Sequence, residues 1–312
     1  MQYFYIILPQ LVSFCILILL GVLMVKVHII TSDNLSLLSG LVVKLVLPCL
    51  ILSLVWENQT TFSSLWHYRR IAVWQSATYF LLIGLSFLII RICRLQAPTS
   101  NANHGCMIGG NYGFVVIPLM LALFADNGGQ EYIPICAAVD TFFVWTLGMY
   151  LFTNVKGRSA GSRDILKKII NPVVCTFAIG LTLCSLQISL PAPVVSVFDQ
   201  LGNVTCLGLI YLGSSLCFIK LKNLKELKPI LLIVLFRQIL LPVFLHLISR
   251  AFLPEIERMC IVLITAAPSL SSASMIARQY HVDENYASSA VFITTLASGI
   301  TIPLVFYLMA VL

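Results

Sequence analysis

The sequence predicts an all-α integral membrane protein whose chain crosses a bilayer ten times. The composition is the first observation, because 59% of the 312 residues are hydrophobic, only 10% are charged, and the mean hydropathy is +0.98. A soluble domain carries about 25% charged residues. The second observation is a series of apolar runs of about 20 residues, each long enough to cross a bilayer. The third is that two of these runs are interrupted near their middle by glycine, asparagine and proline.

Ten spans follow from these runs, each bounded by charged residues or turn signals. Five lie before the longest polar link, 156–168, and five after it. We therefore expect two five-helix repeats, 1–155 and 169–312. The second is inverted relative to the first because the number of spans in each repeat is odd. The predicted spans are 3–25, 35–56, 71–91, 104–124, 131–153, 167–188, 193–219, 229–249, 257–279 and 286–311.

The loop charges predict the orientation. Thirteen lysines and arginines lie at the ends of spans on the side of the central link, and four lie on the opposite side. Basic residues favour the cytoplasmic side of a membrane. The link is therefore expected in the cytoplasm, with both termini outside.

The two interrupted spans are the candidate binding site. Proline and glycine weaken a helix, and backbone freed in this way is tolerated at membrane depth only where protein buries it or it lines a cavity. Pro118 and Pro268 are 150 residues apart, about half the chain. Broken helices at matching positions of two halves indicate a transporter's binding site. The alternative is a pair of kinked helices that are sealed by their neighbours.

The residue types at the breaks suit the capture of an anion. Half-helix amino ends offer free N–H groups and a positive dipole, and small polar side chains add donors. Some of the serines must instead satisfy freed carbonyl groups. The residues expected to bind substrate at the breaks are Asn111, Tyr112, Gly113, Pro118, Pro268, Ser269, Ser271 and Ser272.

Three charged residues lie deep inside predicted spans, away from their ends, where a charge costs at least a few kcal/mol. Lys44 precedes Pro48 by four positions and either contributes to the site or extends to the interface. Asp140 either carries a coupling proton or is paired structurally. Arg237 either meets a substrate carboxylate or pairs with Asp140.

Several classes of protein are disfavoured. No GxSxG, HExxH, P-loop or dinucleotide motif is present, and the five histidines are scattered, so neither an enzyme nor a cofactor is expected. The ten cysteines mostly lie in apolar runs without a CxxC pair, so no metal is expected. The net charge of +7 comes from short loops and does not indicate nucleic acid.

Several stretches resemble the auxin efflux carrier family of membrane transporters, within the bile/arsenite/riboflavin transporter superfamily. They follow the family's order over essentially the whole chain. The stretches are Asn111-Tyr112-Gly113-Phe114 with Pro118, Asn171-Pro172, Leu212-Gly213-Ser214-Ser215-Leu216, Ala266-Ala267-Pro268 with Ala277-Arg278-Gln279-Tyr280, and Ala287–Ser298 with Pro303.

The resemblance implies ten helices in two inverted repeats, with the fourth and ninth helices crossing at their prolines. It also implies a scaffold of the first, second, sixth and seventh helices beside a transport domain that moves like an elevator. By position, Asn111, Pro118 and Pro268 fall at the crossing, and Leu212–Leu216 faces it. The chain lacks the long cytoplasmic loop of many plant members, so it resembles the compact bacterial type of the inner (plasma) membrane.

The expected function is secondary transport of a small organic anion, a carboxylate such as a dicarboxylate or an auxin-like acid. Partners are the lipid bilayer and that anion, with coupling to H⁺ or Na⁺ left open, and a homodimer through the scaffold is an expectation from the family. The nearer alternative is a sodium-coupled bile-acid or steroid symporter. A sterol- or ligand-sensing membrane module and an intramembrane enzyme are the further ones.

Overall fold

The computed structural model describes residues 2–125, 128–154, 172–202, 204, 206–218 and 227–312. This part of the chain is built from helices and contains no strand, only an isolated bridge between Gly110 and Ser269. The prediction of an all-α protein is therefore confirmed. The link 156–168, Asn171 and the basic residues at 220–225 lie outside the described residues.

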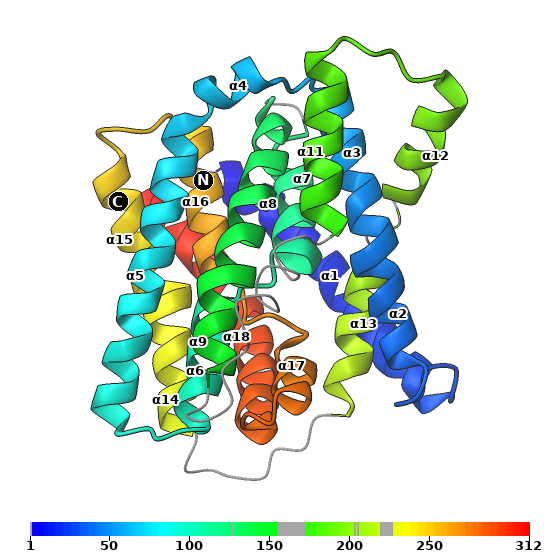
Figure 1. The fold of residues 1–312 in the computed structure, drawn as a ribbon. Helices are drawn as coiled ribbons and strands as arrows, with labels where there is room; N and C mark the ends of the chain where they lie inside the picture. The colour runs from blue at the N-terminus through cyan, green and yellow to red at the C-terminus, as the bar shows by residue number, and fades with distance from the viewer. Residues whose placement is uncertain (1, 126–127, 155–171, 203, 205, 219–226) are drawn as a thin grey trace.

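The helices run mostly along one direction, so that many begin at one end of the molecule and finish at the other (Figure 1). Their bounds are α1 Gln2–Lys26, α2 Leu35–Leu41, α3 Leu47–Glu57, α4 Phe62–His67, α5 Arg69–Cys93, α6 Thr99–Ile108, α7 Ile117–Leu123, α8 Tyr132–Phe143, α9 Met149–Thr153, α11 Pro172–Ser185, α12 Ala192–Gly202, α13 Cys206–Leu216, α14 Leu227–Ile233, α15 Leu241–Ser249, α16 Glu255–Ala266, α17 Ala273–Gln279 and α18 Glu284–Val311.

Five helical segments in the described residues are long and apolar enough to span a bilayer. They correspond to the third, fifth, seventh, eighth and tenth predicted spans, and the chain is therefore that of a multi-pass membrane protein. The first predicted span coincides with α1, and the second, fourth, sixth and ninth coincide with shorter or interrupted helices, so the total of ten and the two-repeat division stay predictions. The five segments are Arg69–Cys93, Gly129–Thr153, Ala192–Leu216, Leu227–Ser249 and Glu284–Val311.

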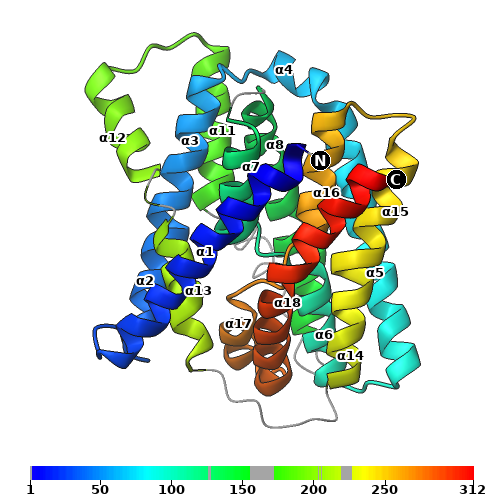
Figure 2. The same cartoon turned by 180° about the vertical axis from the view of Figure 1, so that it is seen from behind.

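Two groups of helices lie side by side. One contains α1, α2, α3, α11, α12 and α13, and the other contains α5, α6, α9 and α14 to α18 (Figures 1 and 2). In the first group α1 and α13 approach so closely that a Cβ atom on Gly213 would lie 1.9 Å from the carbonyl oxygen of Ile18. Small residues allow this approach between membrane helices.

Both termini lie at the same end of the molecule (Figures 1 and 2). The last turns of α1 and α5, which carry Lys26 and Arg91, lie at the opposite end. This arrangement separates the termini from two of the basic helix ends, as the predicted orientation requires. Which end faces the cytoplasm stays a prediction.

Within the described ranges, wide π-helical turns interrupt four of the spans: Val42–Val46, Tyr112–Val116, Val144–Gly148 and Val234–Leu240. In the first, second and fourth cases a proline follows at the start of the next α-helix, as Pro48, Pro118 or Pro242. A proline ring clashes with the carbonyl group four residues before it, and widening the turn relieves this clash. Such turns frequently occur at functional sites.

Candidate functional site at two paired helix breaks

Two spans lose their helical backbone near the centre of the molecule. The first break follows Ile108, the last residue of α6, and ends where a π-helical turn begins at Tyr112. The second follows Ala266, the last residue of α16, and ends where α17 begins at Ala273. Both lie in the stretches that the sequence indicated.

The prolines occupy different places in the two breaks. Pro268 lies within the second break, but Pro118 lies in the first turn of α7, well after the first one. The π-helical turn Tyr112–Val116, which runs directly into α7, accommodates the proline ring and its missing N–H group. Gly109, Gly110 and Asn111 therefore form the first break. The position of Pro118, which matches that of Pro268 in the other half of the sequence, does not mark this break.

The two breaks are hydrogen-bonded to each other. The amide of Asn111 donates to the carbonyl oxygen of Pro268 at 2.9 Å, and the amide of Leu270 donates to that of Gly109 at 2.9 Å. These bonds form a short antiparallel bridge between Gly110 and Ser269. Residues that lie half a chain apart in the sequence thus form one structural unit.

Asn111 is the residue of the first break with unused hydrogen-bonding capacity. Its side chain is 1% exposed, and its amide nitrogen Nδ2 has no hydrogen-bond partner among the residues that the structure describes. The residue precedes the helical segment Tyr112–Leu123, whose first N–H groups have no carbonyl of their own helix to bond. A buried donor next to a helix amino end is suited to an anion.

The serines of the second break divide into two groups. The hydroxyl of Ser269 donates to the carbonyl oxygen of Cys106 at 2.8 Å, so it satisfies a carbonyl freed by the first break. Ser271 is buried and its hydroxyl has no partner, whereas Ser272 is half-buried. Ser271 therefore resembles Asn111 in having a buried polar group available to a ligand.

Tyr112 and Gly113 contact neighbouring helices instead of the break. The hydroxyl of Tyr112 donates to the carbonyl oxygen of Ile133 in α8 at 3.0 Å. A Cβ atom on Gly113 would lie 2.7 Å from a methyl group of Leu47 in α3. These two residues hold the half-helix against its neighbours, which was not evident from their position in the motif.

Arg237 is fully buried against the first break. Its Nη1 atom lies within hydrogen-bond distance of three carbonyl oxygens, those of Cys106 at 3.2 Å, Met107 at 2.7 Å and Gly109 at 2.9 Å. Within the described residues Arg237 forms no ion pair with a carboxylate. The predicted pairing with Asp140 is therefore wrong as a direct contact. The guanidinium instead donates to carbonyl oxygens at the end of α6, because the last carbonyl groups of a helix lack partners within that helix.

Asp140 is buried in α8, where its carboxylate accepts a hydrogen bond from the hydroxyl of Tyr79 in α5. The ring of Tyr79 stacks on that of Phe143, one turn after Asp140. Gln75 reinforces the same helix pair by donating to the carbonyl oxygen of Cys136 at 2.9 Å. Sequence reasoning missed Tyr79 and Gln75, because no spacing rule links two residues 61 positions away from their partners.

Lys44 is exposed in its π-helical turn and forms no ion pair among the described residues. Its helix nevertheless approaches the first break, since Leu47 lies against Gly113. The helix that follows Lys44 therefore lies near the candidate site, but Lys44 itself forms no ion pair there among the described residues.

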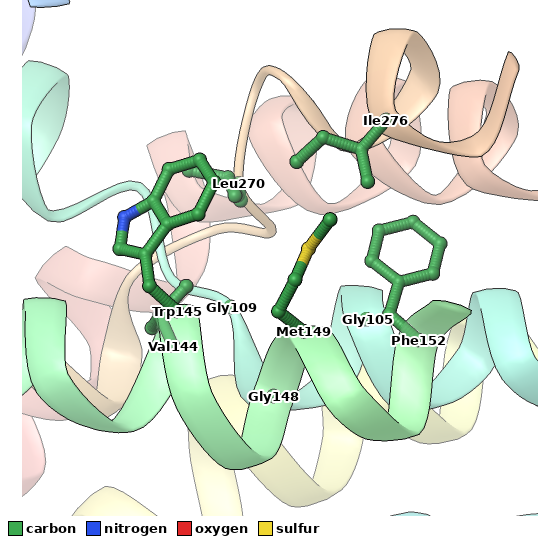
Figure 3. Close-up of a pocket in the computed structure, with 9 residues that line it drawn as sticks. All are labelled: Gly105, Gly109, Val144, Trp145, Gly148, Met149, Phe152, Leu270 and Ile276. Atoms are coloured by element: carbon green, nitrogen blue, oxygen red, sulfur yellow. The ribbon is translucent and has the colours of Figure 1, made fainter. Parts of the chain in front are cut away.

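A shallow apolar pocket adjoins the breaks (Figure 3). The side chains of Trp145, Met149 and Phe152 project from the α8–α9 span toward Leu270 and Ile276, as Figure 3 shows. Because these walls carry no charged group, they are suited to the apolar part of a ligand.

Comparisons with known proteins identify the family of the chain. None of the curated proteins that were compared matches the chain. In the described residues no group of histidine, cysteine and acidic side chains could hold a metal ion. The model of the membrane transport protein family matches residues 6–306. The chain therefore belongs to this family of membrane transporters, the auxin efflux carrier family that its motifs resemble.

Proposed function

We propose that the protein is a secondary transporter of a small organic anion, and that a carboxylate binds where the two breaks meet. The observation that carries this proposal is the buried amide nitrogen of Asn111, which has no partner and precedes a helix amino end. A buried donor without a partner costs free energy unless a ligand completes it. Ser271 supplies a second hydroxyl of the same kind.

The positive charge of the site comes from Arg237 and Lys44 in different ways. Arg237 acts at a distance, because its hydrogen bonds are directed to backbone carbonyls of the first break. The exposed Lys44 attracts the anion as it approaches the site. Pro118 and Pro268 shape the two half-helices, and Tyr112 and Gly113 anchor the first of them.

The proposed motion is an elevator-type displacement of the group that contains α5, α6 and α14 to α18 against the group that contains α1, α3, α11, α12 and α13. At the boundary of the two groups, a Cβ atom on Gly208 of α13 would lie 2.6 Å from the ring of Phe114. Tyr211 packs edge-to-face on the same ring, with centroids 5.6 Å apart. Among the described residues no ion pair crosses this boundary, so few directional bonds oppose a sliding motion.

Asp140 is the proposed coupling residue. It is a buried carboxylate whose bonded partner is the hydroxyl of Tyr79 and not a cation. A carboxylate buried at this depth in a span is a candidate to carry a proton. In this proposal H⁺ accompanies the anion, the chain lies in a bacterial plasma membrane with both termini outside, and the two repeats are 1–155 and 169–312. Dimerisation through the α1, α3 and α12 group is part of the same proposal.

The test is the apparent melting temperature of the purified protein against a panel of monocarboxylates and dicarboxylates at two pH values. A ligand that binds only the folded protein raises this temperature by mass action. We expect one carboxylate class to stabilise the wild type but not Asn111→Ala. No response to any carboxylate, together with a response to bile acids or sterols, would contradict the proposal.

A further inference from the structure

A group of basic side chains lies at the end of the molecule that carries both termini. His246 lies near the end of α15, Arg250 directly follows this helix, and Arg258 lies near the start of α16. The two helices pack against each other, and the end of α18 lies beside them (Figures 1 and 2). His246 and Arg250 are four positions apart, so they lie on one face of α15. We call these three residues the basic cluster.

The charge of the basic cluster is not neutralised by an acid. Arg250 and Arg258 both act electrostatically on the ring of His246, so the three side chains form one unit. No side-chain carboxylate of the described residues lies within ion-pair distance of any of them. Glu257 is adjacent to Arg258 in the sequence, but its carboxylate accepts a hydrogen bond from the hydroxyl of Tyr132 in α8 at 3.5 Å. Within the described part of the chain, the cluster is therefore positive charge without a counter-ion.

Two nitrogen atoms of the cluster are buried without a hydrogen-bond partner among the described residues. They are Nδ1 of His246, which is 4% exposed, and Nε of the half-buried Arg258. Buried polar atoms in this condition cost free energy until a ligand completes them. Arg250 is exposed, and its Nη1 atom donates to the carbonyl oxygen of Leu312 at 2.5 Å. This bond leaves the other donors of its planar guanidinium available.

The other two arginines at this end have partners. The guanidinium of Arg69 lies over the ring of Trp66 at 4.6 Å and donates to the carbonyl oxygen of the same residue at 2.6 Å. That of Arg70 lies 3.9 Å from the carboxylate of Glu257. Basic residues are uncommon on the outer side of a membrane protein, where the loop charges place this end. A basic cluster at this end without an acidic partner indicates a ligand.

Large apolar side chains lie exposed beside the basic cluster. They include Phe244 and Leu247 on α15 and Phe252 in the connection to α16. The ring of Phe252 packs on that of Trp74 in α5, with centroids 5.9 Å apart. Tryptophan is enriched where a membrane meets water. The cluster is therefore expected at the level of the lipid head groups, with apolar side chains available to acyl chains.

We propose that the basic cluster binds the phosphate group of an anionic phospholipid. Guanidinium groups present planar pairs of donors that suit phosphate oxygens, and basic pockets between membrane helices bind anionic head groups. The same positive charge disfavours a zwitterionic lipid, whose choline group it repels. Inorganic phosphate presents similar oxygens, but the exposed apolar side chains favour a lipid. This inference concerns a different part of the molecule from the breaks and does not rest on the proposed function.

The first experiment is a titration of the wild-type protein in detergent with phosphatidylglycerol, with the apparent melting temperature as the readout. Phosphatidylcholine is titrated in parallel, as is sodium phosphate against NaCl at equal ionic strength. We expect a saturating rise with phosphatidylglycerol, a smaller one or none with inorganic phosphate, and none with phosphatidylcholine. Equal rises with the two lipids would overturn the proposal, because they would show binding without regard to charge. A response to inorganic phosphate at least as large as that to phosphatidylglycerol would overturn the lipid as the ligand.

The second experiment removes one charge of the cluster. Without lipid, Arg258→Gln should be as stable as the wild type, because the guanidinium has no ion pair to lose among the described residues. It should raise the half-saturating concentration of phosphatidylglycerol about tenfold, since a hydrogen bond to a charged group is lost. Arg278→Gln is the matched control, because it changes the net charge equally and Arg278 is exposed and bonded to Glu284. If Arg258→Gln responds to the lipid as the control does, the proposal is wrong.

A further variant keeps the experiment informative if Arg258→Gln does not fold. Arg250 is exposed, so Arg250→Gln should fold. We expect it to weaken the response to phosphatidylglycerol and to leave phosphatidylcholine without effect. An unchanged response of Arg250→Gln to phosphatidylglycerol would contradict a phosphate site in the basic cluster.

Discussion

Replacing Asn111 by alanine should leave the empty protein as stable as the wild type while abolishing its response to the anion. The unpartnered Nδ2 atom of Asn111 costs about 1–3 kcal/mol of folding free energy. Its removal offsets the roughly similar cost of the small cavity that alanine leaves. The two terms oppose each other, so we expect a net change within about 1 kcal/mol.

Asn103 is the matched control, because it is equally buried in α6 but fully bonded. It donates to the hydroxyl of Ser86 at 3.1 Å and accepts from the hydroxyl of Tyr286 at 2.8 Å. Asn103→Ala creates a similar cavity but breaks these bonds, each worth about 1 kcal/mol. The cavity terms cancel between the two variants, so Asn103→Ala should be less stable than Asn111→Ala by about 3–5 kcal/mol.

The assay is the apparent melting temperature of both variants in the same detergent, without and with the carboxylate that stabilises the wild type. We expect Asn103→Ala to melt several degrees below Asn111→Ala. Equal and large losses in both variants would refute the reasoning, because they would mean that the Asn111 amide is already bonded in the empty protein. An undiminished response of Asn111→Ala to the anion would remove Asn111 from the site.

Three further predictions concern coupling, packing and approach of the anion. Asp140→Asn should abolish the increase of transport at acidic pH without changing the melting temperature, and Tyr79→Phe should weaken that increase. If both variants keep the wild-type pH profile of uptake, Asp140 is not the coupling residue. Gly213→Ala should lower the melting temperature, because its new Cβ lies 1.9 Å from backbone that cannot give way, at a cost of about 1–3 kcal/mol, whereas Gly299→Ala, with open space around it, should not. Lys44→Gln should keep the melting temperature but raise the half-saturating anion concentration, most clearly at low salt; an identical concentration at low and high salt in wild type and variant would show that Lys44 does not attract the anion.

Hydropathy and residue type predicted the helical class and the two broken stretches, because the physical requirement is local in both cases. A membrane span needs about 20 apolar residues, and a helix that contains adjacent glycines is weakened where they lie. The position of the first break was less predictable. Pro118 is the strongest helix breaker in its stretch, yet it is accommodated by the wide turn Tyr112–Val116 before it. Gly109 and Gly110 open the backbone instead.

The partners of the buried ionisable groups could not be predicted, because they depend on helices far apart in the sequence. Arg237 donates hydrogen bonds to the carbonyl oxygens of Cys106 and Met107, about 130 residues before it, and not to a carboxylate. The carboxylate of Asp140 accepts a hydrogen bond from the hydroxyl of Tyr79. For both residues the sequence states only that a buried charge needs partners, and several kinds of partner satisfy that need.

The breaks are asymmetric in a way that determines which ligand they favour. On the carbonyl side, Arg237 and Ser269 supply donors to the oxygens that the first break releases, so this side is completed by the chain itself. On the amino side, the amide nitrogen of Asn111 and the hydroxyl of Ser271 have no partners. What the chain leaves unfilled is therefore rich in hydrogen-bond donors and lies near a permanent positive charge. Such a site disfavours a cation and favours a ligand that presents oxygen acceptors with negative charge, which is the chemistry of a carboxylate.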